Sequence, residues 1–272
     1  MEKRKTNFMN LPNAECIPAA IKILENSDSL FKGAKALAEA NLFGHATSTL
    51  ILSMEESMKA VILFFDGNGF EFRKRVKGIN NLFVNHKLRY PLALLLSGMN
   101  IFQDDLEEFV LSIKKEPGVI KEFNKNKNDK KWENLLNVYA LKKMNQLIEE
   151  IKWFLNAEYL RQDGIYVDYD GTIKTPLDIP KEEFDKVYIR VARMRVFLVG
   201  FLNSLDQYNK DFDEELLKAF HDNKKRLIKE KVYSNIGDLI SKYATRGSKP
   251  LEVLLYKVVD FQAEVLGFLE EE

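Results

Sequence analysis

The sequence predicts an all-α protein on three observations. Over long stretches apolar residues recur at spacings of three and four, the period of an amphipathic helix. Only 7 prolines and 13 glycines occur in 272 residues, and they cluster between these stretches. One interval, residues 164–171, instead combines β-branched and aromatic residues with an Asp-Gly pair, which is typical of a turn or a short extended piece. We therefore expect a helical bundle interrupted once.

The helices are expected in the following order. Ala19–Asn41 has one apolar face, whereas Phe43–Phe65 is apolar almost all round near its end and is expected in the core. The residues Asp66-Gly67-Asn68-Gly69 end that helix. Pro91 suits the first turn of the next helix, which Pro117-Gly118 ends. Further helices are expected at Trp132–Leu160, Pro180–Leu205, Asp213–Lys231, Val232–Tyr243 and Pro250–Glu270. We expect a tail at 1–12, a bundle at 13–208 and a C-terminal helical extension at 209–272.

Composition narrows the function classes. Lys plus Arg and Asp plus Glu each number 41, so the net charge is zero and a uniformly basic surface is excluded, although a local basic patch is not. The single cysteine, Cys16, cannot form an intramolecular disulfide, and no Cys/His cluster predicts a metal site. No apolar run reaches the ~18 residues of a membrane span. We expect a cytoplasmic protein without cofactor, metal, DNA or membrane partner.

Glu55, Glu56 and Lys59 lie within the apolar helix that contains residues 50–65. Charges in such surroundings need internal partners, because an unpaired buried charge is costly. Glu55 and Lys59 are four residues apart and share a helical face, so a structural ion pair between them is expected. A functional role for these residues is the alternative.

Two further segments carry candidate chemistry. His86-Lys87, with Arg89 close behind, precedes Pro91, and a histidine beside two cations at a helix start suits phosphate chemistry. A surface or capping histidine is the more common alternative. The second segment runs from Arg161 to Tyr169. Its arginine can bind phosphate and a tyrosine can donate to a developing charge, or the arginine can cap the preceding helix. Three basic stretches, Arg73–Lys77, Lys121–Lys131 and Lys224–Lys231, are read as solvated faces, with Arg73–Lys77 as an alternative RNA path.

Taken together, these motifs carry a resemblance. Glu-Glu-x-x-Lys at residues 55–59 is followed by Asn85-His86-Lys87 and then by Arg-x-x-Gly-Ile-Tyr-Val-Asp-Tyr at residues 161–169, with Pro176 shortly after. This order resembles the AbiV family of abortive-infection proteins in the HEPN superfamily of helical bundles. The resemblance covers about residues 19–205, and the last motif is its most specific part.

The resemblance implies phage defence by abortive infection, in which an infected cell stops its own translation. Many HEPN proteins are metal-independent ribonucleases that use Arg-x(4–6)-His across a dimer to promote attack of a ribose 2′-OH on the adjacent phosphate. This chain departs from the pattern, because the x4 position after Arg161 holds Tyr166.

The resemblance therefore suggests Arg161, His86 and Tyr166 as catalytic residues. Supporting roles fall to a second set: Glu55, Glu56, Lys59, Lys87, Asp168 and Tyr169. The expected partners are a second copy of the chain, RNA or the translation machinery, and a phage-encoded protein as trigger. The alternative is a non-catalytic interaction protein that arrests translation by binding.

Overall fold

The computed structural model describes residues 8–101, 130–169, 171–211, 241–242 and 252–259. These residues are helical almost throughout, with a single two-stranded sheet among them, so the all-α expectation is confirmed. The helices and strands are α1 (Asn13–Glu39), α2 (Phe43–Gly67), α3 (Phe72–Arg75), residues 89–101, α6 (Lys130–Asp163), β1 (Asp168–Tyr169), β2 (Ile173–Lys174) and α7 (Lys181–Asp211). Short 3-10 helices are η1 (Phe8–Asn10), η2 (Ile79–Phe83), η3 (His86–Leu88) and η4 (Pro176–Asp178).

The chain divides into two compact units. The first comprises residues 1–93 and 156–247, and the second comprises residues 94–155 and 248–272. Helix α6 contributes its last turns to the first unit and its preceding part to the second. The boundary expected near residue 208 stays a prediction, because most of the residues that follow it lie outside the described ranges.

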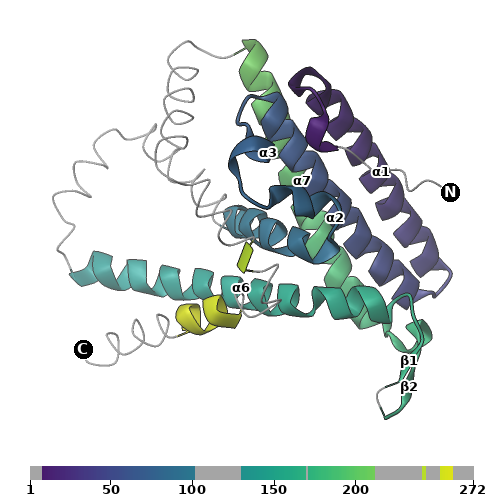
Figure 1. The fold of residues 1–272 in the computed structure, drawn as a ribbon. Coiled ribbons are helices and arrows are strands. Elements are labelled where there is room, and N and C mark those ends of the chain that lie inside the picture. The colour runs from purple at the N-terminus through teal and green to yellow at the C-terminus, as the bar shows by residue number, and fades with distance from the viewer. Residues whose placement is uncertain (1–7, 102–129, 170, 212–240, 243–251, 260–272) are drawn as a thin grey trace, which may run out of the picture. The chain divides into compact units, whose positions relative to one another are not determined.

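Helix α2 forms the core of the first unit. Helix α1 packs along it after a short connection, and α7 packs on it as well, as Figure 1 shows. Leu50, Met54 and Met58 of α2 are almost fully buried, as the apolar pattern predicts. The helix ends at Gly67, and Gly69 adopts a φ of 77°, which confirms the expected stop.

The start of α1 differs from the expectation. The helix begins at Asn13 instead of Ala19 and includes Pro18. Cys16 and Ala20 are both fully buried, so the apolar face of α1 continues back past the proline. Pro18 is the sixth residue of α1, past the four N–H groups that have no intrahelical partner, so it removes one hydrogen bond of the helix.

The expected interruption is a β-hairpin. β1 pairs antiparallel with β2, with Asp168 opposite Lys174 and Tyr169 opposite Ile173. Gly171, with a φ of 73°, makes the turn, and η4 follows behind a capping box formed by Thr175 and Asp178. Figure 1 shows the hairpin extending beyond the N-terminal end of α2, close to the start of α7.

Within the second unit, side chains join residues 94–101 to α6. Ser97 donates a hydrogen bond to Glu150 at 2.7 Å, and Lys143 donates to the carbonyl of Ile101 at 2.7 Å. Ile148, Ile151 and Phe154 are buried.

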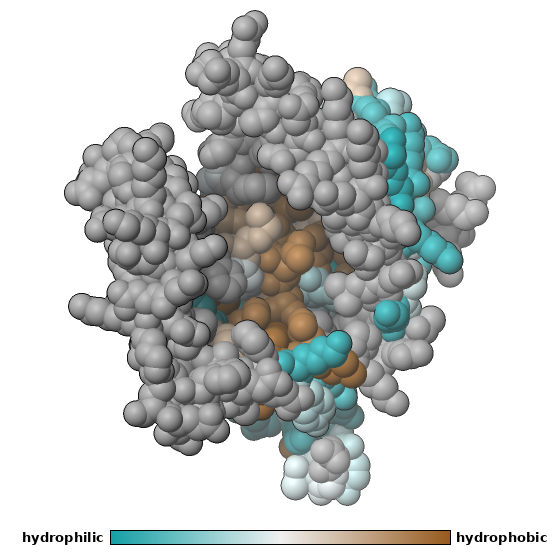
Figure 2. Space-filling model, turned by 90° about the vertical axis from the view of Figure 1, so that its left-hand side faces the viewer, coloured by the Kyte–Doolittle hydropathy of each residue, from teal (hydrophilic) through white to brown (hydrophobic). Residues whose placement is uncertain are grey.

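The described surface is mixed in polarity. Figure 2 shows one face on which hydrophobic residues gather together, with hydrophilic residues both beside them and farther away. Among the described helices, none has the length and apolar character that crossing a membrane requires.

Candidate functional site

A fully buried carboxylate, Glu55 of α2, is the centre of a polar cluster in the first unit. Its Oε2 is hydrogen-bonded to His86 Nδ1 and lies 3.2 Å from Arg89 Nη1. Its Oε1 accepts a 2.8 Å hydrogen bond from the hydroxyl of Tyr90 and lies 3.4 Å from Arg161 Nε. Four side chains therefore share one carboxylate, and His86 and Arg161 contact opposite oxygens of it.

Local structure delivers three of these side chains from one short segment. Asn85 caps η3 by accepting from the backbone N–H of Lys87 at 3.1 Å, and the helix at 89–101 follows immediately. Arg89 is also bound to η2, donating to the carbonyls of Leu82 at 2.9 Å and Phe83 at 3.3 Å. Arg89 therefore holds η2, η3 and α2 together, while His86 keeps one edge in solvent.

The last turns of α6 supply a second carboxylate, Glu158. Its two oxygens accept from Arg161 Nη2 at 3.0 Å and from Nε at 3.1 Å, a bidentate pair. Tyr90 and Gln162 also donate to Glu158, at 3.1 and 2.7 Å. The guanidinium groups of Arg89 and Arg161 thus face three carboxylates, because Glu56 Oε1 also lies 3.7 Å from Arg89 Nη1.

The cluster shifts the ionisation of its members. Burial alone would raise the pKa of Glu158, but hydrogen bonds from Arg161 and Tyr90 and the charge of Arg161 outweigh it and lower that pKa. Burial opposes the charge on Arg161, yet Glu158 and Glu55 raise its pKa. Burial and the charge of Glu55 raise the pKa of Tyr90 far above its ordinary value. At neutral pH Tyr90 is therefore a proton donor, and the pair formed by Glu158 and Arg161 is ionised.

The neighbours of His86 Nδ1 define the tautomer of the ring. Nδ1 contacts Glu55 Oε2 and lies 3.2 Å from Arg89 Nη1, but one nitrogen cannot donate to the first and accept from the second at once. Because Glu55 is a fully buried carboxylate, Nδ1 carries the proton and donates it to Glu55 Oε2. Nε2 is then the ring atom that accepts a proton. The His86 side chain is 43% exposed, so this base has access to solvent.

The expected pair between Glu55 and Lys59 is wrong. Lys59 Nζ instead lies 2.5 Å from Glu56 Oε1, and Asn26 donates to the other oxygen of Glu56 at 3.4 Å. The reason is rotational, because successive residues on a helix point about 100° apart. Glu55 points inward to the cluster, whereas Glu56 and Lys59 lie nearer the surface.

The alternative in which the Arg161 side chain caps the preceding helix is not the arrangement found. Its guanidinium binds Glu55 and Glu158, and its own backbone carbonyl accepts a hydrogen bond from Ser48 of α2. Lys87 is exposed, and its charge contributes to lowering the pKa of Glu158.

Two members of the cluster, Tyr90 and Glu158, had no role assigned from the sequence. Tyr90 follows His86 by four residues, and Glu158 precedes Arg161 by three. These helical spacings were the available signal.

Tyr166, Asp168 and Tyr169 lie outside the cluster. Tyr166 and Tyr169 are 61% and 72% exposed, and the carboxylate of Asp168 accepts from the Tyr169 backbone N–H at 2.8 Å. Within residues 8–101 and 130–169, none of these three side chains contacts Glu55 or His86. Their roles at the site stay predictions.

The basic stretch Arg73–Lys77 is not a uniformly solvated face, nor does it present Arg73 to RNA. Arg73 is buried, where it pairs with Asp66 and donates to the carbonyls of Phe8 and Leu11. Lys74 and Arg75 each form an ion pair with Glu71. Lys224–Lys231 and residues 121–129 lie outside the described ranges.

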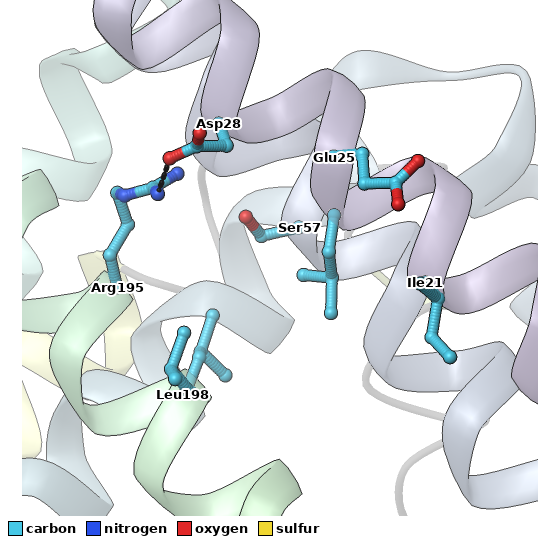
Figure 3. Close-up of a pocket in the computed structure, with 8 residues that line it drawn as sticks. Ile21, Glu25, Asp28, Ser57, Arg195 and Leu198 are labelled. Atoms are coloured by element: carbon cyan, nitrogen blue, oxygen red, sulfur yellow. Dashed lines mark hydrogen bonds and ion pairs between the residues drawn. The ribbon is translucent and has the colours of Figure 1, made fainter.

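A separate cavity of about 390 Å³ lies between α1, α2 and α7. In Figure 3, Arg195 of α7 points toward Asp28 of α1, with 2.5 Å between Nη2 and Oδ1. Ser57 of α2 also lines it, and its hydroxyl lies 2.8 Å from that of Ser27. These polar groups bind one another across the helices, so they fasten the bundle.

Comparison with known proteins decides the family. A model of the AbiV family within the HEPN superfamily matches residues 15–196, most of the chain. The chain belongs to the AbiV family. The match places it among abortive-infection proteins of the HEPN type and includes Glu55, His86, Glu158 and Arg161. No curated protein and no solved structure matched the chain.

Proposed function

We propose that this AbiV protein is an antiphage effector that shuts down translation in infected cells as a metal-independent endoribonuclease. The observation that carries the proposal is the shared carboxylate: His86 and Arg161, far apart in sequence, both contact Glu55. A carboxylate that orients a histidine is the usual support for a general base.

The reaction would use His86 as the base. With Nδ1–H held by Glu55, Nε2 accepts the proton of a ribose 2′-OH while the 2′ oxygen attacks the adjacent phosphorus. The bond from phosphorus to the 5′ oxygen breaks, and that oxygen takes a proton from water. The products are a 2′,3′-cyclic phosphate and a free 5′-OH. Positive charge at the phosphate would stabilise the transition state.

Two cations are available for that charge. The Arg161 side chain is 13% exposed and is mostly occupied by Glu158, so only its outer edge can meet a phosphate. Lys87 is exposed next to His86 and can approach the same phosphate. Lys87 therefore complements Arg161 in this proposal.

A second candidate function is arrest by binding, in which the protein holds RNA, a ribosome or a phage protein without cleaving it. The engagement of Arg161 with two carboxylates favours this alternative, because ion pairs of this kind also occur as purely structural features. The position of Tyr166 outside the cluster, with 61% of its surface exposed, also favours this alternative.

The experiment compares wild type with His86→Ala and with Lys35→Ala, a control at an exposed position of α1. Wild type should cleave RNA in excess chelator and leave 2′-deoxy substrates intact. His86→Ala should lower cleavage by ~10²–10⁴-fold. It should also abolish phage protection with little change in Tm, because the side chain is partly exposed. Lys35→Ala should behave as wild type. Phage protection without RNA cleavage under any condition would favour arrest by binding.

A further inference from the structure

The hairpin segment, residues 165–177, exposes a concentration of large apolar side chains. Five of them are more than 60% exposed: Tyr166, Val167, Tyr169, Ile173 and Leu177. Contiguous exposed apolar surface is uncommon on soluble proteins and marks interaction sites. Most large apolar side chains elsewhere in the first unit are buried. The hairpin segment differs from the rest of that unit because its apolar side chains are exposed.

The hairpin segment is fixed at its base. A Cβ at Gly44 of α2 would overlap the backbone of Pro176, and a Cβ at Gly164 would overlap the backbone of Gly44, so three backbone segments meet there in close contact. Ser48 also binds the carbonyl of Arg161, just ahead of the hairpin. A two-stranded hairpin alone is marginally stable in water. Here α2 supports it, so its apolar side chains are held outward in a defined arrangement.

Charge restricts what can bind this surface. Residues 163–178 contain four aspartates and one cation, Lys174. Asp163, Asp168 and Asp178 are exposed. Acidic groups repel the phosphates of RNA and would also repel the same hairpin of a second copy. They favour a partner that is basic around an apolar centre.

We propose that the hairpin segment is a docking surface for a protein partner whose complementary surface is apolar and basic. Tyr and other large apolar side chains supply most of the binding energy at protein interfaces, and charge complementarity accelerates association. The surface is distinct from the Glu55 cluster and does not depend on whether that cluster cleaves RNA.

The test uses a photo-crosslinking residue, p-benzoylphenylalanine, introduced in the full chain at Tyr169 in phage-infected cells. The matched control carries it at Tyr256, a tyrosine of similar exposure in the second unit, at residues 252–259. A protein crosslinked from Tyr169 and not from Tyr256 is then purified, and its affinity for the unmodified chain is measured by calorimetry.

We expect that affinity to fall at least tenfold with Tyr169→Ser and with Ile173→Ser, and to remain unchanged with Tyr256→Ser. Asp168→Lys should weaken binding further, and higher salt should reduce the wild-type affinity. Tm should stay unchanged in each variant, because these side chains are exposed.

Four results would overturn the proposal. They are crosslinks from Tyr169 to RNA alone, crosslinks to a second copy alone, no excess over Tyr256, and a captured protein that binds the Tyr169→Ser and Asp168→Lys chains as tightly as wild type.

Discussion

At the scale of single residues, Glu55 and Glu56 are adjacent in α2, but their side chains differ in burial and in the groups that they contact. Glu55 is fully buried and contacts two arginines, a histidine and a tyrosine. The Glu56 side chain is 18% exposed, pairs with Lys59 and lies 3.7 Å from Arg89 Nη1. The two positions therefore compare the centre of the buried ionic network with its edge.

Glu55→Gln should destabilise the protein far more than Glu56→Gln. The amide keeps the shape of the side chain but removes the carboxylate that Arg89 and Arg161 share, and breaking a buried pair costs about 3–5 kcal/mol. The loss at Glu56 should be about 1 kcal/mol, near the value for pairs close to the surface. Urea unfolding of both variants measures the difference. Equal losses would show that Glu55 is not the centre of the network.

Glu158 should contribute to acid unfolding. Its pKa is lower in the folded protein than its ordinary value of 4.5, through Arg161 and Tyr90 against the opposing effect of burial. The contribution to stability is therefore complete above that ordinary value and is lost as pH falls through the lower folded pKa. Denaturant unfolding at several pH values should show a smaller loss of stability on acidification for Glu158→Gln. Parallel acid profiles of variant and wild type would contradict this expectation.

The sequence identified some residues of the cluster but not the contacts between them. Glu55, His86 and Arg161 were candidates because charged or titratable groups at those positions needed a partner or matched a motif. Their association is tertiary, and no local spacing rule connects positions 31 residues apart or more. Glu158 was overlooked because a single sequence does not distinguish a buried glutamate from a surface one.

At the scale of elements, the joint between α2 and the hairpin segment depends on small residues. Gly44 faces the backbone of Pro176 with no room for a Cβ, whereas Gly33, exposed within α1, has nothing within 4 Å of the same position. Gly33 lies in the interior of α1, whereas Gly44 is the second residue of α2.

Gly44→Ala and Gly33→Ala should change stability in opposite directions. At Gly33 the methyl group meets open space, and replacing a helical glycine should stabilise by about 0.5–1 kcal/mol. At Gly44 the methyl must displace backbone, and overpacking of this kind costs about 1–3 kcal/mol. Thermal unfolding of both variants tests the contrast. A stabilised Gly44→Ala protein would mean that the joint is loose.

The elements themselves were largely predictable. Periodicity located α2, α6 and α7 to within a few residues at most ends, and the Asp-Gly pair marked the hairpin. The start of α1 was not found, because Pro18 reads as a boundary, although burial of Cys16 and Ala20 outweighs its cost. Which way the hairpin projects depends on the glycine contacts with α2, which no sequence pattern encodes.

At the scale of the whole molecule, α7 has a second apolar side. Ile189, Val196 and Val199 are 51%, 76% and 49% exposed, and spacings of seven and three place them on one helical face. Other α7 side chains, among them Val187, Val191 and Met194, are buried against the bundle. A two-fold axis would place this exposed stripe against the same stripe of a second copy.

We predict a homodimer that uses this stripe. Light scattering of the purified protein should give about twice the chain mass of 31.6 kDa. Val196→Lys should give the single-chain mass, because two lysines would meet at the axis without partners. Its Tm should then be independent of concentration, unlike that of wild type. Tyr169→Ser, which alters the hairpin segment, should leave the mass doubled. A wild-type monomer at micromolar concentration would exclude any site shared between two chains, and the Glu55 cluster would have to act within one.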